Sequence, residues 1–359
     1  MRKDAEQTRH VQNGNVETAH TASLAYVSDD EPGISRKRAG KRFRYEAANG
    51  RKVVSKKVLA RIGALAIPPA WTDVWICAES DGHIQATGRD QRGRKQYRYH
   101  PDWLDRRGEL KFSSLAEFAR ALPRLRRQID RDLRLRGPVR ARVVAAIVWL
   151  LDNTMIRVGS AAYARENGSF GLTTLRNRHV DIEGSTLRFA FKGKSGKEWR
   201  LRLVDRRMAK VVRGIQELPG QTLFQYLDDV GARAPISSQD VNDYIRAAAG
   251  AAFSSKHFRT WGGTVRALTL FAQTPVPESE RARARACNKV IDDVARHLGN
   301  TRAVCRTGYI HPEVISAWSE GRLSDELAAC HAKRNPQLAP DERITLAWLS
   351  PPEKPVRKQ

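Results

Sequence analysis

Three basic side chains and one tyrosine, far apart in the sequence, have types that could act together on a phosphodiester. They are Arg157, Lys194, Arg259 and Tyr309. Attack on phosphorus builds negative charge on the phosphoryl oxygens, which two guanidinium groups can neutralise through paired hydrogen bonds. A lysine can protonate the departing sugar hydroxyl, and a tyrosine can form a covalent phosphoester that keeps the bond energy for resealing. This chemistry requires no metal and no nucleotide.

Tyr309 lies in the segment 299–312, between a loop rich in small and polar residues and a new helix. Pro312 suits the first turn of that helix, and Val314 and Trp318 recur at helical spacing. A tyrosine at a helix start can be exposed and firmly held, as a nucleophile must be. The alternative is a ring that packs under the helix start, as most such tyrosines do.

Arg157 follows a helix that we expect from Pro138 to Met155 and that is apolar on most faces of its C-terminal half. Such a helix is expected to be buried, and a charge at its end needs a partner. Asp152 is available as a structural partner. A phosphate is the functional alternative.

Lys194 lies in the sequence Gly-Lys-Ser-Gly, between two segments in which apolar and polar residues alternate. This pattern predicts a β-hairpin with Lys194 at its tip, where the side chain is either solvated or able to enter a DNA groove. Arg259 precedes the pair Gly262 and Gly263, which allows close approach of another backbone at a cost in helix stability.

The segment 88–100 interleaves cations with glutamine and tyrosine at strand spacing. Gln96 could pair with adenine in the major groove, while Tyr97 and Tyr99 could reach phosphates or stack on base edges. A two-stranded ribbon with these side chains would fit that groove. The alternative is a solvated edge strand.

The composition indicates a polyanionic partner. The chain has 359 residues, enough for two domains, and 64 Lys+Arg against 39 Asp+Glu give a formal charge of +25. This charge fits nucleic-acid binding but does not by itself distinguish DNA from RNA. The four cysteines have no zinc spacing, and the paired carboxylates Asp228-Asp229 and Asp292-Asp293 are expected on helix surfaces.

Neither a membrane span nor a signal peptide is expected. The longest uninterrupted apolar run, 143–151, is far shorter than the roughly 20 residues that a spanning helix needs. The N-terminus is polar and lacks an apolar core. We therefore expect a cytoplasmic, nucleoid-associated protein with reduced thiols.

An ordered set of motifs resembles the type IB DNA topoisomerases, in particular the small bacterial branch that is similar to the poxvirus enzyme. The resemblance covers roughly residues 24–330. The matching segments are Gly93–Tyr99, Ile156–Gly159, Tyr163–Asn167, Gly171–Val180, the hairpin around Lys194, Lys256–Trp261 and the stretch around Tyr309.

The resemblance implies an α+β fold and a monomer that forms a C-shaped clamp around duplex DNA. A disordered tail would span 1–22, a small antiparallel-sheet DNA-binding domain 23–104, and a mainly helical catalytic domain with a three-stranded sheet 105–335. A C-terminal tail would span 336–359. The activity would be relaxation of positive and negative supercoils through a 3′-phosphotyrosyl intermediate, without ATP, metal or other cofactor.

The resemblance also implies roles for individual residues. Tyr309 would be the nucleophile, Lys194 the general acid, and Arg157 and Arg259 the groups that stabilise the transition state. The DNA contacts would come from Arg94, Lys95, Gln96, Tyr97, Tyr99, Tyr163 and Lys256.

Asn300 is the one position that departs from the common pattern of the family. The family usually has a histidine nine residues before the tyrosine, where it bonds a non-bridging phosphoryl oxygen. The Asn300 amide can still donate a neutral hydrogen bond there. Its neighbours His297 and His311 have the wrong spacing, and we expect them on a helix surface and at a helix cap.

Two other functions compete with this interpretation. A tyrosine recombinase shares the Arg–Lys–Arg–Tyr set but usually has His-x-x-Arg at the second arginine, where this chain has Lys256-His257-Phe258-Arg259. A catalytically inactive DNA- or RNA-binding protein would explain the charge. It would not explain four catalytic side-chain types kept together.

Overall fold

The computed structural model describes residues 23–40, 42–91, 93–250 and 253–350. It divides into two compact units, Met1–Ser113 and Ser114–Gln359, which we call the N-terminal and C-terminal units. The expected disordered tail, 1–22, lies outside the described residues. Each unit mixes helices and sheet, so the expected α+β class is confirmed.

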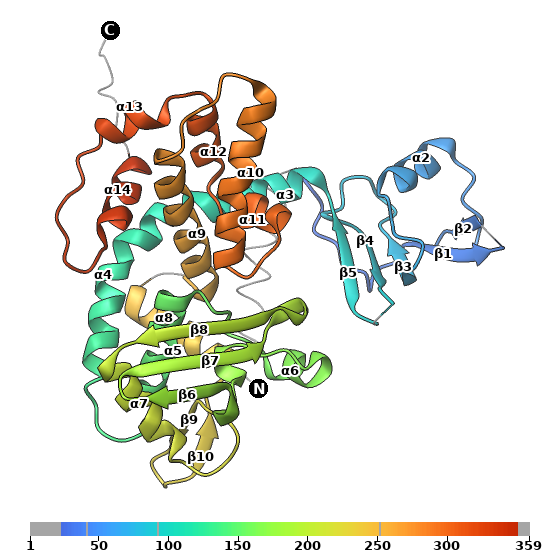
Figure 1. Ribbon diagram of the computed structural model, residues 1–359. Coiled ribbons are helices and arrows are strands. Elements are labelled where there is room, and N and C mark those ends of the chain that lie inside the picture. Colours follow the sequence, from blue (N-terminus) through green and yellow to red (C-terminus); the bar gives the residue numbers. More distant parts are fainter. Residues whose placement is uncertain (1–22, 41, 92, 251–252, 351–359) are drawn as a thin grey trace. The chain divides into compact units, whose positions relative to one another are not determined.

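The N-terminal unit is built on a five-stranded antiparallel sheet (Figure 1). In spatial order its strands are β2 (Arg42–Glu46), β1 (Ile34–Ala39), β3 (Thr72–Ile76), β4 (Ile84–Arg89) and β5 (Lys95–Tyr99). The unit also contains α2 (Lys56–Ala64), capped by the Ser55 hydroxyl, and ends with α3 (Pro101–Ser113). Buried apolar residues of α2, β1, β3 and β4 form its core.

The C-terminal unit is mainly helical (Figure 1). Its helices are α4 (Leu115–Asp132), α5 (Arg140–Thr154), α6 (Ala161–Asn167), α7 (Arg206–Gln216), α8 (Ser238–Ala249), α9 (Ser255–Ala272), α10 (Glu280–His297), α11 (Arg302–Gly308), α12 (Pro312–Ser319), α13 (Leu323–Ala328) and α14 (Pro340–Trp348). The described helices of both units include none that is long and apolar enough to cross a membrane.

Two small sheets and three short 3₁₀ turns complete this unit. The three-stranded antiparallel sheet has the order β6 (Val180–Glu183), β7 (Thr186–Lys192) and β8 (Glu198–Val204). The 3₁₀ turns are η1 (Leu172–Thr174), η2 (Asn177–His179) and η3 (Lys194–Gly196). Strands β9 (Gln225–Leu227) and β10 (Arg233–Pro235) pair with each other, and the turn between them contains Asp228 and Asp229, which we had expected on a helix.

Helix α5 is buried on most faces, as its apolar sequence predicts. It begins at Arg140 rather than at Pro138, with Val139 as its N-cap. Helix α4, in contrast, is not broken at Pro123. The proline is buried inside a continuous helix whose apolar face includes Phe118 and Leu125, and this packing outweighs the loss of one backbone hydrogen bond.

Residues 340–348 are not part of a tail, contrary to expectation, because α14 packs against the rest of the C-terminal unit. Glu342 is buried and accepts hydrogen bonds from Arg126 at 2.7 and 2.8 Å and from Trp261 Nε1 at 2.9 Å. Arg126 also forms an ion pair with Asp152 at 2.7 Å. This buried network joins α4, α5, α9 and α14. No local pattern in residues 336–350 predicts it.

Replacement of Glu342 by Ala tests the contribution of this network. The change leaves Arg126 with one carboxylate instead of two and removes the acceptor of Trp261. We expect the free energy of unfolding to fall by about 3 to 5 kcal/mol, measured by urea denaturation. Asp229→Ala, at an exposed turn, is the control and should change stability by less than about 0.5 kcal/mol. Equal stability of the two variants would contradict a structural role for α14.

Candidate active site

Arg259 lies in the first half of α9 and is buried, with 4% of its surface exposed. Its Nη2 donates to Leu298 O at 2.6 Å, and its Nη1 donates to Met155 O. Met155 and Leu298 are the C-caps of α5 and α10. Carbonyls at helix C-termini lack intrahelical donors and carry partial negative charge, so a buried cation is well placed there. Arg259 therefore joins three helices at one point.

Arg157 follows the end of α5, in a segment held by η1. Leu172 N donates to Arg157 O at 2.9 Å, and Gly171 approaches so closely that a Cβ there would lie 2.5 Å from the same oxygen. The half-buried guanidinium donates to Asn300 Oδ1. Asp152, the structural partner that we considered from the sequence, pairs with Arg126 instead. Burial, and then the nearby charge of Arg157, lower the pKa of Arg259.

Tyr309 is the C-cap of α11, not the end of a loop as the sequence suggested. The small and polar residues 302–308 form a short helix because Thr301 caps it and Cys305 anchors it in the core. Tyr309 N donates to Cys305 O at 3.0 Å, and the guanidinium carbon of Arg259 lies 5.0 Å from the centre of the half-buried Tyr309 ring. Three predicted site residues, Arg157, Arg259 and Tyr309, are thus neighbours.

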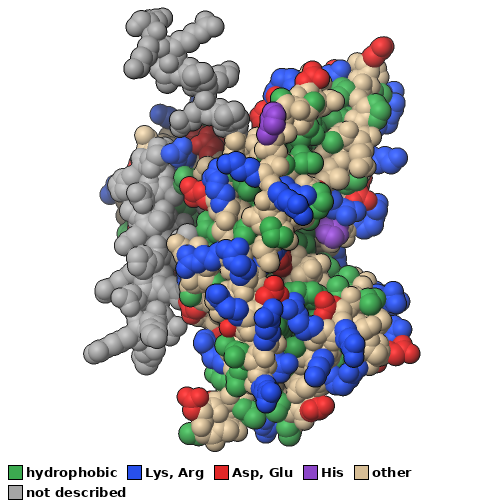
Figure 2. All heavy atoms as spheres, turned by 90° about the vertical axis from the view of Figure 1, so that its left-hand side faces the viewer, with side chains coloured by type: hydrophobic (Ala, Val, Ile, Leu, Met, Phe, Trp, Pro, Cys, Tyr) green, Lys and Arg blue, Asp and Glu red, His purple; other side chains and the backbone are tan. Residues whose placement is uncertain are grey.

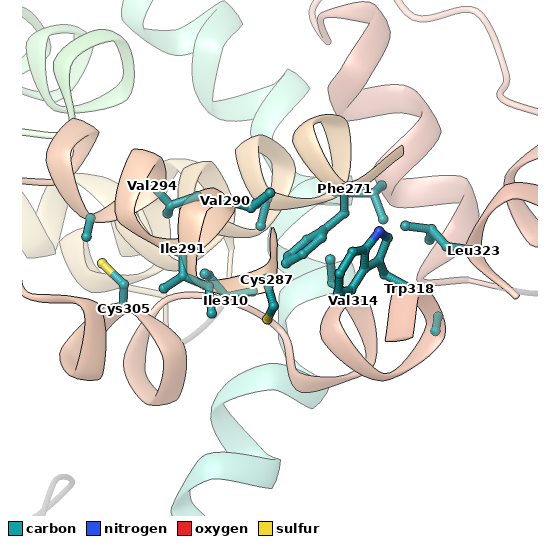
Figure 3. Packing of buried hydrophobic residues seen from close by; sticks show 14 of the residues in the cluster. Phe271, Cys287, Val290, Ile291, Val294, Cys305, Ile310, Val314, Trp318 and Leu323 are labelled. Atoms are coloured by element: carbon teal, nitrogen blue, oxygen red, sulfur yellow. The ribbon is translucent and has the colours of Figure 1, made fainter. Parts of the chain in front are cut away.

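Both sides of Tyr309 are anchored. Ile310 follows it and is fully buried in the core of the C-terminal unit, among residues of α10 and α12 (Figure 3). Pro312 then opens α12 as predicted, with Val314 and Trp318 buried. On α9, Thr264 Oγ1 accepts from His311 N at 3.1 Å. The tyrosine backbone is therefore fixed while its ring stays partly exposed.

The predicted close approach at the glycine pair is confirmed. A Cβ on Gly263 would lie 2.6 Å from the backbone oxygen of Tyr309, which is closer than real Cβ atoms come. A Cβ on Gly262 would instead meet the end of the flexible Met155 side chain at 2.8 Å. Only Gly263 therefore sets the distance between α9 and the tyrosine backbone.

Gly263→Ala should displace Tyr309 relative to Arg259. A shift of about 1 Å at reacting groups costs roughly 10²-fold in rate, so we expect a loss of this order in the rate of covalent DNA adduct formation. Gly262→Ala is the matched control, because alanine favours the helix equally at both positions and Met155 can move aside. Wild-type cleavage by Gly263→Ala would show that the close approach has no effect on the tyrosine.

Asn300 is buried, and its side-chain amide faces the interior of the C-terminal unit, toward Arg157. Its Oδ1 accepts from Arg157, its backbone oxygen accepts from Lys197 Nζ, and its buried Nδ2 lacks a nitrogen or oxygen acceptor among the described residues. The neighbouring Cys305 thiol is a weak acceptor, and burial raises the pKa of that thiol. Asn300 thus holds the side chain of Arg157.

Lys194 lies at the tip of the β7–β8 hairpin, as predicted, and its side chain is exposed. It makes no ion pair with any residue that the structure describes. Lys197, three residues further along the same hairpin, is the lysine that contacts the site, through the Asn300 backbone oxygen. The sequence contains no signal for Lys197, because the contact joins segments about a hundred residues apart.

Two further predicted DNA contacts lie in the C-terminal unit. Lys256 is exposed in the first turn of α9, one turn before Arg259, and Tyr163 is half-buried on α6. His311 caps α12, as expected, by accepting from Glu313 N at 3.2 Å, and His297 is in the last turn of α10. His297 is exposed, whereas His311 is half-buried and its burial lowers the pKa of its imidazole.

The remaining predicted contacts lie on β5, at one edge of the N-terminal sheet, or just before it. Tyr97 and Tyr99 stack with their ring centres 5.7 Å apart. Asp90 binds both Arg94, at 2.6 Å, and Gln96, at 3.0 Å. Lys95 pairs with Asp29 at 2.6 Å, and this contact raises the pKa of Lys95. Of these five predicted DNA contacts, Arg94, Lys95 and Gln96 are thus oriented by carboxylates.

The surface agrees with a polyanionic substrate. Lys and Arg side chains are spread over most of the described face in Figure 2, with Asp and Glu interspersed. Within the part of the chain that the structure describes, no three His, Cys, Asp or Glu side chains form a group able to hold a metal ion.

Comparison with known proteins identifies the class of this protein. Residues 100–329 match the family model of the eukaryotic DNA topoisomerase I catalytic core, and residues 42–90 match that of the bacterial DNA topoisomerase IB N-terminal domain. The first match spans more than half of the chain and contains Arg157, Lys194, Arg259, Asn300 and Tyr309. The chain belongs to the type IB DNA topoisomerases, enzymes that relax DNA by cleaving and resealing one strand.

Individual relatives agree. DNA topoisomerase 1B of Acanthamoeba polyphaga mimivirus is 32% identical over 285 residues, which cover 77% of this chain and 85% of the relative. DNA topoisomerase 1B of Vaccinia virus (strain Copenhagen) is 26% identical over 133 residues, 36% of this chain and 42% of the relative. DNA topoisomerase 1 of Mycosarcoma maydis is 27% identical over 232 residues, 58% of this chain and 22% of the relative.

Proposed function

We propose that Tyr309 is the nucleophile of this topoisomerase. Its hydroxyl oxygen attacks a backbone phosphorus, a bond forms between the tyrosine and the 3′ phosphate, and the bond to the 5′ oxygen breaks. The 5′ oxygen leaves with a proton. Resealing is the reverse reaction, so no external energy source is needed. The single observation that carries this assignment is the buried Arg259 guanidinium 5.0 Å from the Tyr309 ring.

Arg259 and Arg157 are proposed to bind the phosphoryl oxygens in the transition state. Arg259 contacts the tyrosine and Arg157 lies close enough to Arg259 to lower its pKa, so the two supply preorganised positive charge where negative charge develops. They also favour the phenolate form of the attacking hydroxyl. Asn300 is proposed to act through Arg157, whose side chain it holds. To donate directly to a phosphoryl oxygen, as the family resemblance implies, the Asn300 amide would have to turn.

Lys194 is proposed as the general acid that protonates the 5′ oxygen. A cation at an exposed hairpin tip can approach the leaving group once DNA is bound. Lys256 and Tyr163 are proposed to contact phosphates near the cleaved bond. On the N-terminal unit, Lys95, Tyr97 and Tyr99 share one face of β5 because side chains of a strand alternate. We propose that this face and the pair Arg94 and Gln96 contact the duplex.

A single copy of the chain is proposed to cleave and reseal DNA without ATP or a metal ion. The proposed groups supply the nucleophile, the charge stabilisation and the proton, so each step has a donor within the protein. We expect relaxation of both positively and negatively supercoiled plasmid in buffer that contains EDTA and lacks ATP, followed on agarose gels.

Tyr309→Phe should bind plasmid but form no covalent adduct and relax no supercoils, because the variant lacks only the attacking oxygen. Tyr226→Phe, a half-buried tyrosine on β9, is the control and should keep activity. Relaxation by the Tyr309 variant would show that another residue is the nucleophile. Strand exchange between two duplexes by the wild type would indicate a recombinase instead.

The two arginines should differ in what their loss changes. Arg157→Ala should slow cleavage by roughly 10²–10³-fold, the effect of removing one preorganised transition-state donor, with little change in stability. Arg259→Ala should show a similar loss of rate and also destabilise the protein by at least about 2 kcal/mol, because two buried carbonyls lose their donor. Single-turnover cleavage and urea denaturation measure the two effects. Equal stability of both variants would contradict a structural role of Arg259.

A further inference from the structure

The β7–β8 hairpin touches the segment that precedes Tyr309 at two points behind its tip. Trp199, on β8, is one of them, and Lys197, at the end of the turn, is the other. Both contact the short segment Gly299-Asn300, between α10 and α11. These contacts lie within the C-terminal unit and join the hairpin of Lys194 to the loop that holds Arg157.

Trp199 packs between two glycines. A Cβ on Gly193, at the start of the hairpin turn, would lie 2.7 Å from the indole, and a Cβ on Gly299 would also lie 2.7 Å from it. A larger residue at Gly299 would therefore push the loop away from the hairpin, and one at Gly193 would displace the indole within the hairpin. The indole is also stacked parallel to Phe191, a buried residue of β7, with ring centres 6.1 Å apart. The sheet thus fixes the ring that contacts Gly299.

Lys197 supplies the polar contact. Its half-buried ammonium group donates to the backbone oxygen of Asn300, and the Asn300 side chain accepts from Arg157. A single residue therefore connects the hairpin to one of the proposed transition-state groups. The tip itself, with Lys194, has no such support and remains exposed.

We propose that Lys197 and Trp199 are positioning residues that hold the β7–β8 hairpin against Gly299-Asn300, so that Lys194 reaches the departing 5′ oxygen. This inference rests on the proposed role of Lys194. With the hairpin held, the Lys194 ammonium gives its proton to the 5′ oxygen as the phosphorus–oxygen bond breaks. In resealing, the 5′ hydroxyl returns a proton to Lys194 as it attacks the phosphotyrosine.

The same contacts could instead serve charge stabilisation rather than proton donation. Lys197 could act on the phosphoryl oxygens instead, by holding Asn300 and hence Arg157. The two roles separate when the leaving oxygen is replaced by sulfur, because a thiolate departs without a proton far more readily than an alkoxide. A defect in proton donation disappears with the 5′-bridging phosphorothiolate substrate, whereas a defect in charge stabilisation remains.

The experiment compares single-turnover cleavage of oxygen and sulfur substrates at saturating enzyme. Lys197→Met removes the cation, and Lys192→Met, an exposed lysine on the same hairpin, is the matched control for lost charge. Gly193→Ala displaces Trp199 without a change of charge and serves as the second variant. We expect Lys197→Met and Gly193→Ala to cleave the oxygen substrate at least about tenfold more slowly, a part of the roughly 10²–10⁴-fold that general-acid catalysis supplies.

The same variants should cleave the sulfur substrate at nearly the wild-type rate, Lys197→Arg should keep most activity, and Lys192→Met should be normal on both substrates. Slow cleavage of both substrates by Lys197→Met would overturn the proposal in favour of action through Arg157. Wild-type cleavage of the oxygen substrate by Lys197→Met would also overturn it. Lys194→Ala is measured in parallel. If sulfur fails to rescue Lys194→Ala, then Lys194 is not the general acid, and the proposed function fails independently of Lys197.

Discussion

The contact between the Arg259 guanidinium and the carbonyls that end α5 and α10 is the interaction on which the rest of the site depends. A buried cation needs compensation, and two helix C-termini provide it without a carboxylate. A carboxylate would have neutralised the positive charge that the proposed reaction requires at the phosphate. Dipoles hold the arginine in place and leave its full positive charge available, and the turns that lead to Arg157 and Asn300 begin at these two helix ends.

Local patterns in the sequence predicted the elements that position the site. Pro312 marks a helix start, period-two alternation marks β7 and β8, and the glycine pair at 262–263 marks a close approach. Each of these signals is carried by neighbouring residues, so it can be seen without the fold. The general division into a sheet-based N-terminal unit and a mainly helical C-terminal unit was implied by the resemblance to the type IB DNA topoisomerases.

The features that sequence reasoning missed depend on contacts between distant segments. The partner of Arg157 is Asn300 rather than the nearby Asp152, because Arg126 and α14 engage Asp152. Helix α11 lacks a long apolar period and forms because Cys305 packs in the core. Lys197 resembles any solvated hairpin lysine until the fold brings it to Asn300. Residue types alone therefore suggested the reactive side chains, but not the contacts that position them.

The close approach of Gly263 to the Tyr309 backbone has a consequence for the interval between cutting and resealing. In the proposed reaction, one DNA end is attached to Tyr309 while the other swivels, and the Tyr309 backbone rests on the same helix that carries Arg259. The backbone that would carry the attached phosphate and the arginine that would bind it are therefore held by one helix. On the proposed mechanism, torque from the rotating duplex would act on the tyrosine backbone and the arginine together, so one helix would keep them aligned for rejoining.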